Sequence, residues 1–165
     1  MKNSFNIEKF LDLTGYDNDV RKARRKNNKD GVSTQEFYTP YSIVKRMCDK
    51  VSDEDWADPK KTFLEPSFGH GQFILFILYK RIVEYNIDWE QALSTVWGIE
   101  LMSDNVAECK QRVHKMLEAI APDYDKDKAN EIMDHNFVCS NFFEWNFEEW
   151  RPMTDEEIKL SKKKK

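Results

Sequence analysis

The chain lacks the features that identify several common classes of protein. Its three cysteines, Cys48, Cys109 and Cys139, are widely spaced and form no C-x-x-C pair, and its three histidines show no metal-ligand spacing. No apolar run approaches the ~18 residues of a membrane span, and the charged N-terminus has no signal-peptide core. We therefore expect a cytoplasmic protein with reduced thiols, no metal site and no contact with a membrane.

What the sequence contains indicates one globular domain with tails. The 165 residues are 40% hydrophobic and 13% aromatic, which is enough for a buried core. The net charge of −4 is unevenly distributed, because two basic runs, at 21–29 and 159–165, contain no acidic residue. The rest of the chain is therefore strongly acidic and is not expected to bind a nucleic-acid backbone.

The basic runs are the candidate contacts with nucleic acid. Positions 21–29 carry six Lys or Arg residues and positions 159–165 carry five. The alternative for both runs is a solvated, disordered tail, and for the C-terminal run that is the preferred interpretation. From the first run we predict these nucleic-acid contacts: Arg21, Lys22, Arg24, Arg25 and Lys26.

The N-terminal part predicts two helices separated by a linker. Apolar residues at helical spacing favour a short helix over 5–13, and 14–32 is polar and without periodicity. Thr39 is a good N-cap and Pro40 suits the first helical position, with Ile43, Val44 and Met47 on one face. Residues 52–61 are interpreted as a polar connection.

Strand and helix patterns then alternate three times. Strands are predicted at 62–65, 95–99 and 136–140, and helices at 71–85, 88–94 and 103–120. The helix from 71 is apolar on almost every side, Ser103 is the expected N-cap of the last one, and 123–134 is read as polar with one helical turn. This alternation predicts an α/β fold with a parallel sheet and right-handed crossovers.

Polar side chains end each predicted strand, and a glycine turn follows the first. Glu65, Glu100 and Asn141 would meet at the carboxyl edge of the sheet, where open α/β sheets bind ligands. Gly69 and Gly71 would let a ligand approach the backbone closely. Because a carboxylate accepts hydrogen bonds from hydroxyls, Glu100 suits a ribose.

Four motifs, taken in order, resemble the S-adenosylmethionine-dependent DNA adenine-N6 methyltransferases of restriction–modification systems and phages. YTPYSIVKRM (38–47) is similar to the family's leading TP motif, and FLEPSFGHGQF (63–73) to its glycine motif. VWGIELMSDNVAECKQR (96–112) resembles its ribose-binding motif, and NFVCSNFFEW (136–145) its adenine-binding motif. The resemblance implies a Rossmann-like methyltransferase fold with about three strands present and an N-terminal helical extension.

The resemblance also implies a site for S-adenosylmethionine. The leading motif would help to enclose the methionine end, Glu100 would hold the ribose hydroxyls, and Asn141 would accept from the adenine amino group in place of the family's Asp. The implied cofactor-binding residues are Tyr38, Thr39, Pro40, Glu65, Pro66, Ser67, Phe68, Gly69, Gly71, Phe73, Glu100, Leu101, Asn141 and Phe142.

The family's catalytic motif, Asn/Asp/Ser-Pro-Pro-aromatic, is missing from the sequence, which contains no Pro-Pro pair. In the family this motif accepts hydrogen bonds from the target amine and stacks on the flipped base. No catalytic residue is therefore assigned, and a second chain that supplies the catalytic half along the exposed edge of the third strand is expected. An alternative is a natural short protein with a basic tail.

The sequence leaves three functions open. The first is a DNA methyltransferase, the second a catalytically silent module that binds S-adenosylmethionine or a partner, and the third a methyltransferase acting on RNA or protein. A dehydrogenase is disfavoured because the third glycine of its motif is missing. The predicted organisation is an N-terminal helix and basic linker (1–32), a cofactor-binding domain (33–150) and a lysine-rich tail (151–165).

Overall fold

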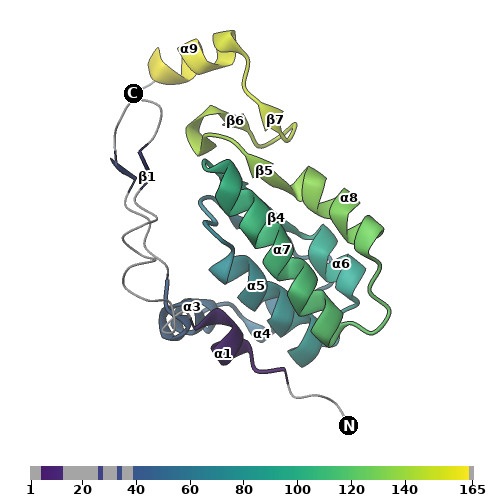
Figure 1. The fold of residues 1–165 in the computed structure, drawn as a ribbon. Coiled ribbons are helices and arrows are strands. Elements are labelled where there is room, and N and C mark those ends of the chain that lie inside the picture. Colours follow the sequence, from purple (N-terminus) through teal and green to yellow (C-terminus); the bar gives the residue numbers. More distant parts are fainter. Residues whose placement is uncertain (1–4, 13–25, 28–32, 35–38, 164–165) are drawn as a thin grey trace.

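The computed structural model describes residues 5–12, 26–27, 33–34 and 39–163. Three parallel strands form its central sheet in the order β3-β4-β5 (Figure 1). They are β3 (Phe63–Glu65), β4 (Val96–Glu100) and β5 (Phe137–Cys139). Because Glu65 lies beside Gly98 and Glu100 beside Cys139, all three strands end at one edge. The predicted α/β class and parallel sheet are confirmed.

Helices α5 (Gln72–Tyr79) and α7 (Ser103–Ile120) each supply several residues of the core that covers this sheet. Helix α5 contacts β4, and α7 contacts both β4 and β5. Five consecutive side chains of α5, from Ile74 to Leu78, are buried, so burial on most sides is confirmed for this helix. In α7 the buried apolar residues recur at helical spacing, as Val106, Cys109, Val113, Met116 and Leu117.

The helix predicted over 71–85 differs from the structure in its second half. After Tyr79 the chain forms a π-helical turn, η1 (Lys80–Glu84), which ends at Tyr85. Within this turn Val83 is 46% exposed and Arg81 is completely buried. The apolar pattern alone placed Val83 inside, and that interpretation was wrong.

Shorter helices complete the layers. Helices α1 (Ile7–Leu11) and α3 (Tyr41–Cys48) pack on α5, and α6 (Trp89–Ser94) packs on α8 (Lys126–Asn136). Helices α1, α3 and α6 were predicted. The N-cap of α3 is Pro40, however, where Thr39 was expected. Ser103 likewise begins α7 without capping it. Met47, expected on the inner face, is 52% exposed.

Two helices lie in segments that were interpreted as connections. Helix α4 (Asp53–Ala57) begins after Ser52, whose hydroxyl accepts from the Asp55 N–H, and it buries Trp56. Helix α8 has eleven residues where 123–134 predicted one turn. Asp125 caps it, and only Ala129, Met133 and Asn136 are buried, which is a sparse apolar signal.

Two small antiparallel pairs and a final helix were not predicted. Strands β1 (Lys26–Asn27) and β2 (Ser33–Thr34) pair with each other, as do β6 (Trp145–Asn146) and β7 (Arg151–Pro152). A 3₁₀ turn, η2 (Phe142–Glu144), precedes β6, and α9 (Asp155–Lys163) follows β7. The predicted boundary after residue 150 therefore falls inside the β6–β7 hairpin, and 155–163 are helical.

Within the described ranges, no helix combines the length and the apolar character that crossing a membrane requires.

Candidate functional site

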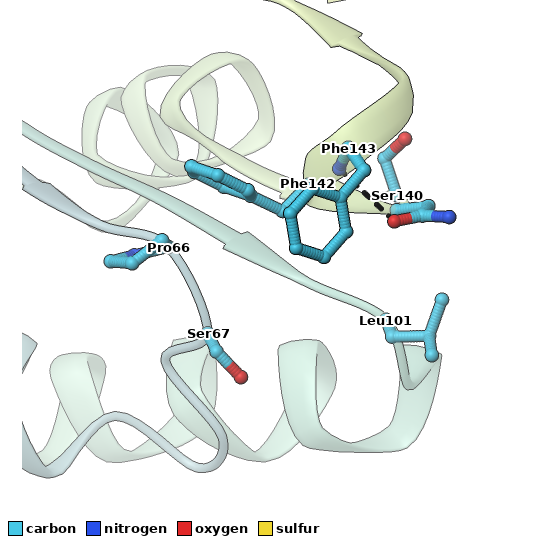
Figure 2. Close-up of a pocket in the computed structure, with 7 residues that line it drawn as sticks. Pro66, Ser67, Leu101, Ser140, Phe142 and Phe143 are labelled. Carbon is cyan, nitrogen blue, oxygen red and sulfur yellow. Dashed lines mark hydrogen bonds between the residues drawn. The ribbon is translucent and has the colours of Figure 1, made fainter. Parts of the chain in front are cut away.

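A cavity lies where the three parallel strands end (Figure 2). It has a volume of about 390 Å³ and mostly apolar walls. One side is the turn after β3, one is the end of β4, and the third is the segment after β5, from which Phe142 and Phe143 project. The lining residues are Pro66, Ser67, Leu101, Ser140, Asn141, Phe142 and Phe143.

The turn after β3 depends on two glycines with positive φ. Gly69 has a φ of 53° and Gly71 a φ of 95°, which are angles that other residues rarely adopt. A Cβ on Gly71 would lie 2.4 Å from the Sγ of Cys109, so this glycine also permits the close approach of α7. Gly71 accepts the first hydrogen bond of α5, from the Leu75 N–H.

Glu100 joins the glycine turn to the end of β4. Its carboxylate accepts from the N–H of Gly69 at 2.8 Å and from the N–H of Met102 at 2.9 Å. The side chain is only 6% exposed and does not line the cavity. The carboxylate therefore fixes the turn, while each oxygen keeps a second lone pair that could accept from a ligand.

Glu65 occupies a different environment at the end of β3. Its Oε1 accepts from the Ser67 N–H at 3.2 Å. Burial raises the pKa of the Glu65 carboxyl, the Ser67 hydrogen bond offsets part of this shift, and the negative charge of Glu100 adds to it. A cationic group beside Glu65 would lower that pKa again.

The segment after β5 is held in place by backbone and side-chain hydrogen bonds. The Ser140 N–H donates to the Glu100 carbonyl at 3.0 Å, and the Asn141 Oδ1 accepts from the Phe143 N–H at 3.1 Å. The dashed line in Figure 2 marks the second of these bonds. Phe143 is 72% exposed beside the cavity, so a large apolar ring faces solvent there.

The structure brings together part of the predicted site. Five predicted residues line the cavity: Pro66, Ser67, Leu101, Asn141 and Phe142. Glu65, Gly69, Gly71 and Glu100 form the adjoining strand ends and turn without lining it. Phe68 is buried against Phe137, and Phe73 packs against the core.

The remaining predicted residues lie farther along the chain or outside the described ranges. Thr39 is brought to the start of α5, where its carbonyl accepts from the Gln72 Nε2 at 3.0 Å, and Pro40 is exposed beside it. Lys26 belongs to β1. Tyr38, Arg21, Lys22, Arg24 and Arg25 lie outside the described residues.

Sequence reasoning missed four residues of this region. Ser140 and Phe143 line the cavity, and both flank residues that were predicted. Arg112 donates to the His70 carbonyl in the glycine turn and to the Oε1 of Gln72, the first residue of α5. Arg112 carried a signal in the sequence, because it lies between the buried Cys109 and Val113 of α7 and is itself partly buried, where a charged side chain needs a polar partner.

The cavity has the general character of a small-molecule site. Ligand pockets of about 300–1,000 Å³ combine apolar walls with a few polar groups that fix orientation. Here the polar groups come from Ser67, Ser140 and Asn141.

No group of three or more side chains suited to a metal ion occurs in the described part of the chain. No family model, curated protein or solved structure matches the chain.

Proposed function

We propose that the cavity binds S-adenosylmethionine and that the chain is the cofactor-binding part of a DNA adenine-N6 methyltransferase with a Rossmann-like fold, acting in the cytoplasm. One observation carries the proposal. Three segments that resemble the family's glycine, ribose and adenine motifs contribute Ser67, Leu101 and Asn141 to a single cavity at the carboxyl edge of a parallel sheet.

The chemistry of the lining supports this ligand. Apolar walls formed by Pro66, Leu101 and Phe142 suit the faces of an adenine ring, and the Asn141 amide suits its amino group. The ribose hydroxyls would donate to the remaining lone pairs of Glu100, close to the glycine turn. The bound cofactor supplies an activated methyl group, and the residues of this chain orient it.

Calorimetry with S-adenosylmethionine tests the proposal. We expect one site, and we expect Glu100→Ala to weaken it by about 1–3 kcal/mol because the hydrogen bonds to the ribose are removed. A sharper pair of variants uses two exposed leucines. Leu101 is 62% exposed and lines the cavity, whereas Leu160 is 60% exposed on α9.

Both leucine substitutions should leave the free energy of unfolding nearly unchanged, since neither side chain is buried. Leu101→Ala should raise the Kd about fivefold, equivalent to about 1 kcal/mol of apolar burial against the ligand. Leu160→Ala should bind as the wild type does. A folded wild-type chain that gives no heat at millimolar cofactor would refute the proposal.

A second candidate, a catalytically silent binding module, is favoured by the missing Pro-Pro-aromatic motif. Both candidates predict cofactor binding, and they differ in methyl transfer. Incubation of this chain with tritiated cofactor and mixed-sequence DNA should give background counts. If a second chain with the catalytic motif is then supplied, methylation of adenine should appear for the methyltransferase and remain absent for the silent module. RNA and protein acceptors in parallel reactions test the third function.

A further inference from the structure

Two polar side chains, Gln72 and Arg112, connect segments that are far apart in the sequence. Gln72 is the first residue of α5 and is only 4% exposed. Its Nε2 donates to the Leu11 carbonyl at 2.8 Å and to the Thr39 carbonyl at 3.0 Å. One side-chain amide therefore joins the end of α1, the residue before Pro40 and the start of α5.

Arg112 joins the same region to α7. One guanidinium nitrogen donates to the His70 carbonyl, inside the glycine turn, at 2.9 Å. The other donates to the Gln72 Oε1 at 2.9 Å and reaches the Phe10 carbonyl at 3.5 Å, and the group lies 5.7 Å from the Phe10 ring centroid. Arg112 thereby orients the Gln72 amide so that its NH₂ group faces Leu11 and Thr39.

Helix α1 depends on these contacts for its position. A helix of five residues is too short to be stable alone, since helix nucleation is unfavourable. Its own anchors are the buried side chains of Ile7 and Leu11. Because the bonds from Gln72 and Arg112 are partly or fully buried, breaking them leaves polar backbone groups without compensation.

We propose that Gln72 and Arg112 are positioning residues that dock α1 and Thr39 against the glycine turn and so complete the binding site for S-adenosylmethionine. This inference rests on the proposed function for its ligand. Its structural part, the dependence of α1 on the pair, stands on the contacts alone. The pair makes α1, which contributes no residue to the cavity, a determinant of affinity through the turn.

Hydrogen exchange and calorimetry on the full chain test the inference together. The variants are Gln72→Leu and Arg112→Met, which keep much of the volume and remove the hydrogen bonds, with Arg112→Lys as the conservative rescue. Met133→Ala, in the buried part of α8, serves as a control for general destabilisation. The reporters for α1 are the N–H groups of Phe10 and Asp12, which bond to Asn6 and Glu8.

In Gln72→Leu and Arg112→Met, these two N–H groups should exchange at least about tenfold faster, with exchange in β4 and α7 much less affected. The Kd for S-adenosylmethionine should rise about tenfold, because only a fraction of molecules then has α1 docked. Arg112→Lys should recover part of both effects, since its ammonium can still donate to the His70 carbonyl. Met133→Ala should produce neither faster hydrogen exchange confined to α1 nor a specific rise in the Kd.

Unchanged exchange of α1 in both variants would overturn the inference, and so would a released α1 with wild-type affinity. A loss of affinity equal to that of Met133→Ala at equal destabilisation would also count against it. If the wild-type chain does not bind the cofactor, the proposed function fails, and the exchange data still decide whether the pair positions α1.

Discussion

Glu65 and Glu100 end neighbouring strands, and their carboxylates are stabilised to different degrees. Glu100 accepts two backbone hydrogen bonds, from Gly69 and Met102, whereas Glu65 accepts one, from Ser67. Burial raises the pKa of Glu65 in the folded protein, so the folded state binds its proton more readily than the unfolded state. Stability contributed by the protonated form is therefore lost as the pH rises through that pKa.

Glu65→Gln should consequently stabilise the chain without ligand at pH 7–8. The amide keeps an oxygen for the Ser67 N–H and removes the charge that burial opposes. The gain in melting temperature should shrink as the pH falls toward the ordinary carboxyl pKa of 4.5. Thermal unfolding between pH 4 and 8 measures this, with Glu118→Gln, an exposed position on α7, as the control. A variant less stable than wild type at pH 8 would contradict the argument.

Gly71 is constrained by both conformation and space. Gly71→Ala should destabilise the chain by about 2–4 kcal/mol, combining left-handed strain with overpacking against Cys109. Gly69 also has positive φ but nothing lies within 4 Å of its added Cβ, so Gly69→Ala should cost about 1 kcal/mol. Denaturant unfolding compares the two. Equal destabilisation by the two variants would show that the approach of Cys109 is unimportant.

At the scale of elements, short apolar runs were sufficient to predict β3 and β4, an almost continuous apolar stretch to predict α5, and apolar residues at helical spacing to predict α7. The β6–β7 hairpin escaped prediction because its turn contains no glycine. Trp150 takes a φ of 50°, and the Asn146 Oδ1 accepts from the N–H groups of Glu148 and Glu149. Within the hairpin Trp150 contacts Trp145, and its contact with Trp97 of β4 is tertiary and leaves no local pattern.

Helix α9 is attached to that hairpin through Glu157. The Glu157 carboxylate pairs with both terminal nitrogens of Arg151 and accepts from the Thr154 N–H, while the Thr154 hydroxyl accepts from the Glu157 N–H, which is a capping box. The hydrogen bond with Arg151, followed by that from Thr154, lowers the pKa of Glu157 to about 2.

Glu157→Ala should therefore loosen α9 with little effect on the parallel sheet. The folded pKa is depressed, so the stabilising contribution is present above the ordinary pKa of 4.5 and is lost as the pH falls toward about 2. Faster hydrogen exchange in 155–163 at pH 7 is the expected result, with α7 unchanged. Glu156→Ala, one position earlier, is the matched control, and equal loosening by both variants would exclude a specific role for Glu157.

At the scale of the whole molecule, the sequence predicted which strand ends meet, since parallel strands must end at one edge. That rule placed Glu65, Glu100 and Asn141 at one edge, beside the cavity, whereas Ser67 and Leu101 were expected there only from the family resemblance. It could not place Gln72 and Arg112, whose contacts depend on how α1, α5 and α7 pack. It also could not indicate that the Glu100 carboxylate would accept a hydrogen bond from the glycine turn. A strand-end carboxylate has the same local sequence whether it holds a turn or binds a ligand.

The lysines of helix α9 are a candidate DNA-binding surface. Helix α9 has three acidic residues in its first turn and exposed Lys159, Lys162 and Lys163 in its second half. If this end binds DNA, replacing the three lysines by Gln should weaken the complex. The slope of log K against log salt concentration should also become shallower by about 0.9 for each phosphate that no longer pairs with a lysine.

The matched control neutralises three other exposed lysines, Lys50, Lys60 and Lys115, which lie on the acidic body. It changes the net charge equally, so a decrease in affinity due only to net charge would be the same in both triple variants. A shallower salt dependence confined to the α9 variant would locate the DNA-binding surface, because counterions are released only where lysines meet phosphates. Equal slopes in both variants and the wild type would show that α9 does not bind DNA.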